Sequence, residues 1–190
     1  VFWSDHGVGL PRAKRWLYDS GTRIPLIVRQ PGGKAGVSDR LVSSIDFGPT
    51  AMKLAGLKIP KHMQGRSFIH GQPRDYVYGA RDRMDERYDI IRSVRGKRYR
   101  YIRNYEPLKT YYQYMNTPEK GATMKEIRRV AAKGEMPPKA ALFLAPRKPV
   151  EELYDLEADP HEIRNLAGDK KYAKNLKKLR EAHMQWVRDT

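Results

Sequence analysis

The sequence of 190 residues contains no cysteine, so no disulfide can hold its fold together and the compartment cannot be inferred from cysteine usage. It also lacks any stretch close to the ~20 consecutive apolar residues of a membrane-spanning helix. Acidic residues are scarce beside basic ones: 22 Asp and Glu stand against 38 Lys and Arg, which gives a net charge of +16.

The positive surplus favours contact with polyanions such as nucleic acid, anionic lipid or sulfated glycan. The basic residues are spread from Arg12 to Arg188 and form no single tail, so a merely solvated basic surface stays open as an alternative. Hydrophobic residues make up 39% and aromatic residues 10%, which argues for a folded domain and against disorder.

The first part of the chain, 1–70, is typical of the end of an α/β sandwich. Residues 1–3 are expected to end a strand, 7–22 to form a basic, glycine-rich loop, and 25–28 to form a short buried strand. A helix is expected over 49–55, ended by Gly56 in a left-handed cap. Strand, loop, strand and helix in this order fit a layered α/β domain.

The second part, 71–190, predicts a small α+β subdomain. Strands are expected at 76–80, 89–95, 98–103 and 152–156, with Gly96-Lys97 as a tight hairpin turn. The long connection 104–149 carries one predicted helical piece at 124–132 and is read as a wrapping or substrate-facing excursion. Asp159-Pro160 has the pattern of a helix start, and a closing helix is expected over 169–188.

A carboxylate and an imidazole stand side by side where the first strand ends. Neighbouring residues on a regular strand point to opposite faces, so Asp5 and His6 can share one ion only where the strand breaks. Gly7 is expected to supply that break through backbone angles that other residues avoid. A carboxylate suits a hard divalent ion, and the imidazole widens the choice to manganese or zinc. A plain turn with an incidental histidine is the alternative.

Three cations surround a proline in the loop that follows. Arg12, Lys14 and Arg15 could bind a tetrahedral oxyanion and offset charge that develops on a leaving oxygen. Lysine offers a point charge and arginine a flat fork of donors. A solvated basic loop is the alternative.

Several motifs, in order along the chain, resemble one family. Ser-Asp-His-Gly at 4–7 resembles the strand-end element of the type I sulfatases, in the alkaline phosphatase superfamily. The segments 17–28 and 44–67 are similar to the loop-to-strand and Asp-to-Gly-Arg-Ser stretches of that family, and 152–167 is similar to its Leu-Tyr-Asp to Asn-Leu-Ala signature. The loop at 9–15 is loosely most similar to heparan N-sulfatase-like members.

The resemblance implies an α/β fold: the end of an alkaline-phosphatase-like α/β sandwich over 1–70, then a small α+β C-terminal subdomain over 71–190. It implies calcium as the metal, with Asp5 and His6 as ligands, and Lys14 as the catalytic residue that touches the substrate sulfate beside Arg12 and Arg15. The family's formylglycine nucleophile arises from a Cys or Ser in a C/S-x-P/A-x-R motif, which this sequence lacks. The nucleophile and the remaining metal ligands are therefore expected from a missing N-terminal part.

The leading hypothesis is the C-terminal segment of a sulfatase that acts on sulfate esters or sulfamates of a carbohydrate, inactive as a fragment. One alternative is a non-catalytic module that binds a polyanion, although no nucleic-acid motif occurs. Another is a phosphodiesterase or phosphonate hydrolase of the same superfamily. Relatives are mostly exported, so a periplasmic or secreted location is expected, and the oligomeric state stays open.

Overall fold

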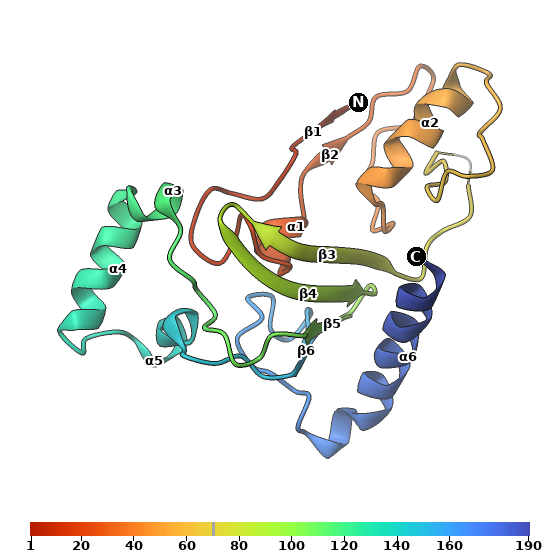
Figure 1. The fold of residues 1–190 in the computed structure, drawn as a ribbon. Coiled ribbons are helices and arrows are strands. Elements are labelled where there is room, and N and C mark those ends of the chain that lie inside the picture. The colour runs from red at the N-terminus through yellow and green to blue at the C-terminus, as the bar shows by residue number, and fades with distance from the viewer. Residues whose placement is uncertain (70) are drawn as a thin grey trace.

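A four-stranded antiparallel sheet forms the centre of the molecule in a computed structural model that describes residues 1–69 and 71–190 (Figure 1). Residue 70, where the first predicted part of the chain ends, lies outside the described residues. The strands follow one another in space as they do in sequence: β3 (Val77–Met84), β4 (Arg87–Arg95), β5 (Tyr99–Asn104) and β6 (Glu151–Asp155). The predicted four strands and their antiparallel pairing are confirmed.

The β4–β5 hairpin closes one residue later than expected. Gly96 donates its N–H to the carbonyl of Tyr99 at 2.9 Å, which leaves Lys97 and Arg98 at the tip instead of Gly96 and Lys97. Arg95 pairs with Arg100 in the register that follows. This register decides which side chains of β5 face the loop at 7–22, because successive residues of a strand point to opposite faces.

Each face of the sheet has its own core. Trp16 and Tyr18 of the N-terminal loop pack on one face with Ile91 and Ile102 of the sheet, together with Tyr154 of β6. The opposite face packs under α6 (Ala173–Asp189) and contains Val94, Tyr101, Leu153, Leu166, Leu176 and Leu179. Alternate side chains of β5 therefore pack against the closing helix on one face of the sheet and against the basic loop on the other.

The N-terminal elements are short, and in Figure 1 β1 and β2 lie above the sheet while α1 lies beside β3. β1 (Phe2–Trp3) pairs antiparallel with β2 (Leu26–Ile27), and one helical turn, α1 (Asp19–Thr22), lies between them. The predicted burial of β2 is wrong for this structure: Ile27 is 63% exposed because β1 is its single described neighbour.

The predicted helix near residue 50 is confirmed. It is α2 (Phe47–Leu54), preceded by the turn η1 (Ser44–Asp46). Gly56 follows with φ of +73° and donates its N–H to the carbonyl of Lys53, as expected of a left-handed cap.

The excursion between β5 and β6 contains three helices and a 3₁₀ turn. They are α3 (Asn116–Glu119), α4 (Ala122–Ala132), α5 (Pro138–Ala141) and η2 (Leu142–Leu144). Met124 and Phe143 bury their side chains in the core around Trp16, so this segment covers the same face of the sheet as the basic loop. Among the described residues, no helix is both long and apolar enough to cross a membrane.

The predicted helix start at Asp159-Pro160 is wrong. The Asp159 carboxylate does accept from the N–H groups of Ile163 and Arg164, at 2.8 and 2.7 Å, but the chain forms only a turn. Glu162 takes φ of +55°, a left-handed conformation that no α-helix allows. The helix begins later, with η3 (Lys170–Tyr172) leading into α6.

Candidate functional site

The candidate site is a groove of about 960 Å³ between the segment that follows β1 and the turn that follows β6. Two residues predicted from the sequence, His6 and Arg12, line this groove. Asp5, Lys14 and Arg15 lie outside its lining, although they belong to the same stretch of chain. The groove therefore joins parts of the chain that are about 150 residues apart.

His6 is oriented by its own neighbour. Its Nδ1 lies 2.6 Å from the carbonyl oxygen of Gly7, and a carbonyl can only accept, so Nδ1 carries the proton. The lone pair of Nε2 is left free, 3.6 Å from the Asp5 carboxylate. The side chains of Asp5 and His6 are 84% and 39% exposed, so both donors are open to solvent. This arrangement suits a divalent ion held by Nε2 and a carboxylate oxygen.

The two donors do not form a complete metal shell by themselves. Within residues 1–69 and 71–190, no group of three or more His, Asp or Glu side chains lies close enough together to hold an ion. Calcium takes six to eight oxygen ligands, so further ligands are required beside this pair.

Gly7 matters for a reason other than the one expected from the sequence. Its φ is not in the left-handed region. It donates its N–H to the carbonyl of Gly21 at 3.0 Å, and a Cβ at this position would lie 2.1 Å from the carbonyl oxygen of Ser20. The residue after His6 must therefore be glycine because two parts of the loop touch through their backbones.

Arg12 ties the basic loop to the turn after β6. Its guanidinium donates to the carbonyls of His161 and Glu162, at 2.9 and 2.5 Å, and lies 3.7 Å above the centre of the Tyr18 ring. Its φ is +59°, a conformation that a non-glycine residue adopts rarely. The same side chain thus closes the loop onto the turn and lines the groove.

Arg15 is held on the other side of the loop. Its Nε donates to the Asp85 carboxylate at 2.7 Å, and its carbonyl accepts from the Arg81 guanidinium at 3.2 Å. Its φ is +80°. The side chain is therefore directed to the β3–β4 hairpin and away from the groove lining.

Lys14 differs from its two arginine neighbours. Its N–H donates to the carbonyl of Val8 at 3.0 Å, but its ammonium makes no ion pair with an acid of the described residues. Of the three predicted cations in the loop, Arg15 pairs with a carboxylate, whereas neither Lys14 nor Arg12 does so within residues 1–69 and 71–190.

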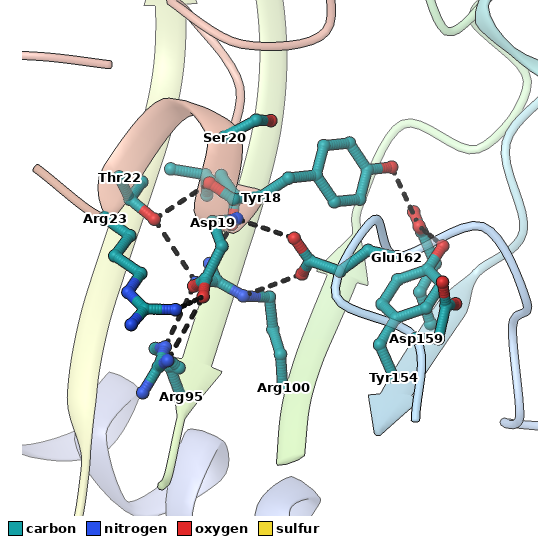
Figure 2. Close-up of polar contacts among 12 residues, drawn as sticks. Tyr18, Asp19, Ser20, Thr22, Arg23, Arg95, Arg100, Tyr154, Asp159 and Glu162 are labelled. Carbon is teal, nitrogen blue, oxygen red and sulfur yellow. Dashed lines mark hydrogen bonds and ion pairs between the residues drawn. The ribbon is translucent and has the colours of Figure 1, made fainter. Parts of the chain in front are cut away.

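Figure 2 shows a buried ion network, and two of its carboxyl residues, Asp19 and Glu162, line the groove. The Arg100 guanidinium lies between Asp19, to which it donates a hydrogen bond, and Glu162, whose Oε1 is 2.9 Å from Arg100 Nε. Glu162 Oε2 accepts from the backbone N–H of Asp19 at 2.6 Å, and Arg95 donates to Asp19 at 2.9 and 3.1 Å. The carboxylate of Glu162 thus fixes α1 to the turn after β6.

The pKa values of the two carboxyls in this network are shifted in opposite directions. Burial raises the pKa of Asp19, but hydrogen bonds from Arg95 and the charges of Arg95 and Arg100 outweigh this effect and lower the pKa overall. For Glu162, burial dominates over Arg100 and raises the pKa to about 7. Glu162 is therefore the carboxyl of the groove wall that binds a proton near neutral pH.

The positions of one groove residue and of one buried arginine beside the basic loop could not be predicted from the sequence. His161, in the segment predicted to start a helix, is exposed and lines the groove together with His6. Arg81 is buried over the Trp16 ring, 4.8 Å from its centre, and lies 4.0 Å from the Asp89 carboxylate. Lys148 donates to the Asp89 carboxylate at 2.9 Å and completes this buried cluster. The residues of the cluster are far apart in the sequence, so no local pattern predicts it.

Comparison with known families settles the relationship of the chain. Residues 10–137 match the family model described as N-sulphoglucosamine sulphohydrolase, C-terminal. The chain belongs to this family. The match covers the basic loop, the sheet strands β3 to β5 and α4, so the family includes the segment that carries Arg12, Lys14 and Arg15.

Relatives of this sulphohydrolase family member extend the match to the whole chain. An ulvan-active sulfatase of Formosa agariphila is 40% identical over 98% of this chain and 32% of its own length. The human N-sulphoglucosamine sulphohydrolase is 25% identical over 100% of this chain and 41% of its own length. The chain thus spans about a third of the length of the curated relatives it matches.

A solved structure gives the same answer for the fold. A 2-O GAG sulfatase aligns with a TM-score of 0.70 and 25% identity, over 98% of this chain and 35% of that one. The predicted membership of the sulfatases and the predicted fold class are confirmed. The matches support the sulfatase interpretation and give no support to the alternative of a polyanion-binding module.

Proposed function

We propose that this chain is the C-terminal part of a sulfatase that hydrolyses sulfate esters or sulfamates on a sulfated carbohydrate. The observation that carries the proposal is the groove in which a family-matched basic loop meets an oriented histidine, with Arg12 and His6 both in the lining. The ulvan-active sulfatase and the 2-O GAG sulfatase act, by their names, on sulfated glycans, which supports a substrate of this class.

Asp5 and His6 are proposed as two ligands of a divalent ion. The free lone pair of His6 Nε2 and the exposed Asp5 carboxylate fit this role, and the bond from Nδ1 to Gly7 fixes the ring. Calcium is the metal that family resemblance favours, and the imidazole also suits manganese or zinc. When bound, the ion would neutralise negative charge on sulfate oxygens.

Lys14 is proposed to touch the substrate sulfate, because its ammonium has no acid partner among the described residues. A fixed positive charge there stabilises the charge that grows on the departing oxygen. Arg12 lines the groove and can add a donor to the substrate. Arg15 is proposed to act mainly by holding the loop, since Asp85 already accepts its guanidinium.

The nucleophile and the remaining metal ligands are proposed to come from outside these 190 residues. The sequence has no cysteine and no serine in a C/S-x-P/A-x-R context, and the two donors Asp5 and His6 form only part of a metal shell. A formylglycine in the rest of the polypeptide would complete the site. A periplasmic or secreted location is proposed, because sulfated glycans lie outside the cell.

The test is the release of inorganic sulfate by the full-length protein from sulfated oligosaccharides, measured by ion chromatography. The Lys14→Met variant is expected to lower kcat/KM by about 10²- to 10³-fold, the loss found on removal of one charge-stabilising donor. Lys34→Met, an exposed lysine in the loop after β2, serves as the matched control and is expected to leave kcat/KM unchanged. Equal losses in the two variants, or no sulfate release by the parent protein, would refute the proposal.

A further inference from the structure

A second hollow adjoins the groove. It has a volume of about 560 Å³ and is lined by Lys139 of α5 and by Arg164 on the turn after β6, together with Ala158, Asp159, His161 and Ile163. His161 and Ile163 line both hollows, so the two are adjacent and share a wall. Of the lining residues, Lys139 belongs to the excursion between β5 and β6.

The charges in this second hollow are not used inside the described part of the chain. Neither the Lys139 ammonium nor the Arg164 guanidinium makes an ion pair or hydrogen bond with residues 1–69 or 71–190. The one acid in the lining, Asp159, accepts from two backbone N–H groups, at 2.8 and 2.7 Å, so its charge is directed into the turn. The hollow therefore presents two unpaired cations against one carboxylate, which leaves a net positive charge in its lining.

The wall that the two hollows share is held firmly. Arg12 donates to the carbonyl of His161, and Glu162 accepts from Asp19 and lies against Arg100. These contacts fix the backbone on both sides of His161, so its imidazole projects from a braced turn. A ligand that crosses from one hollow to the other must pass this side chain.

We propose that the second hollow is a subsite for a second anionic group of the substrate, on a sugar next to the one held at His6. Arg164 offers a flat fork that matches a sulfate or carboxylate, and Lys139 offers a point charge. His161, on the wall that the two hollows share, contacts the sugars that carry the two anions. This inference rests on the proposed function and extends it: the preferred substrate is at least a disaccharide with an anion on each of two residues.

The test measures binding to the full-length protein by isothermal titration calorimetry, with a heparin tetrasaccharide and with glucosamine 6-sulfate as probes. The double variant Lys139→Ala/Arg164→Ala is expected to raise the Kd of the tetrasaccharide about tenfold, or ~1.4 kcal/mol, and to leave binding of the single sugar unchanged. The charge-retaining variant Lys139→Arg/Arg164→Lys is expected to keep most of the affinity.

Lys125→Ala/Lys133→Ala is the matched control, because both lysines are exposed on or next to α4, lie outside the lining and remove the same charge. Equal weakening by both double variants would mean a diffuse attraction to the basic surface and would overturn the subsite. Absence of tetrasaccharide binding by the parent protein would overturn it as well. Release of sulfate from p-nitrophenyl sulfate, which has no second anion, tests the proposed function separately in the same preparations.

Discussion

Arg100 Nε and Glu162 Oε1 lie 2.9 Å apart in a place where water scarcely reaches, since the two side chains are 2% and 1% exposed. The pair joins the centre of the sheet to the turn after β6, and Asp19 brings α1 into the same contact. The groove wall thus depends on charges that are buried against each other.

Removal of Arg100 should therefore be severe. Arg100→Met leaves Glu162 buried without its cation and is expected to lower stability by about 3–5 kcal/mol, the cost found when one partner of a buried pair is lost. The double variant Arg100→Met/Glu162→Gln should recover part of this loss, because no buried charge is stranded. Thermal unfolding followed by circular dichroism measures both, with the exposed Arg129→Ala on α4 as a control that should leave the Tm unchanged. An Arg100→Met protein as stable as its parent would contradict the network.

The raised pKa of Glu162 predicts a pH dependence of stability. The folded pKa is about 7, and an unfolded glutamate titrates near ~4.3, so the folded state holds a proton that the unfolded state releases. The contribution of Glu162 is full below about pH 4 and is lost as pH rises to about 7, by up to ~3 kcal/mol. Glu162→Gln stays neutral, so the Tm of the variant relative to the parent should rise between pH 5 and pH 8. A constant difference in Tm across that range would show that Glu162 is ionised throughout.

Gly7 and Gly9 provide a matched pair for testing the loop. A Cβ on Gly7 would meet the Ser20 carbonyl at 2.1 Å, whereas a Cβ on Gly9 would have no atom within 4 Å. Gly7→Ala is expected to cost about 1–3 kcal/mol and to displace His6, because the clash involves backbone that cannot yield easily. Gly9→Ala should leave the Tm unchanged. If the two variants behave alike, the close approach of the backbone does not shape the site.

Metal content offers a direct test of Asp5 and His6. In the full-length protein, Asp5→Ala or His6→Ala should lower the bound divalent metal measured by inductively coupled plasma mass spectrometry, since each removes one donor. Asp39→Ala, another exposed aspartate that pairs with Lys97, should keep the parent's metal content. Treatment with EGTA should abolish sulfate release, and calcium should restore it. Metal content unaffected by both Asp5→Ala and His6→Ala would place the ion elsewhere.

The sequence predicted most of the fold because its signals are local. The alternation along 98–103 and the Leu-Tyr-Asp run at 152–156 both appear as strands within a residue or two of their expected bounds. The closing helix predicted over 169–188 is also found, and its His183 is buried with Nε2 3.2 Å from the Tyr105 hydroxyl. Patterns of this kind depend on which face of an element is apolar, and a single sequence shows that directly.

The failures involve contacts between distant parts of the chain. Asp159-Pro160-His161-Glu162 has every local feature of a helix start, but the Glu162 carboxylate finds its partners at Asp19 and Arg100, and the backbone bends to reach them. Arg81 lies in a charge-rich stretch of the sequence, but in the structure its guanidinium is buried over the Trp16 ring. Tertiary contacts override local preference at both places, and the turn with Glu162 lines the proposed site.

The position of Trp16 also makes its indole useful as a fluorescent reporter. Its indole is buried two residues after Lys14, under the Arg81 guanidinium and against Phe143, while Trp3 is 46% exposed and Trp186 stacks on Tyr78 at 4.9 Å. The three indoles therefore occupy three different environments, and the buried one lies within the basic loop itself. Its fluorescence gives the loop a built-in optical probe, so that docking or release of this segment can be followed in real time without a label.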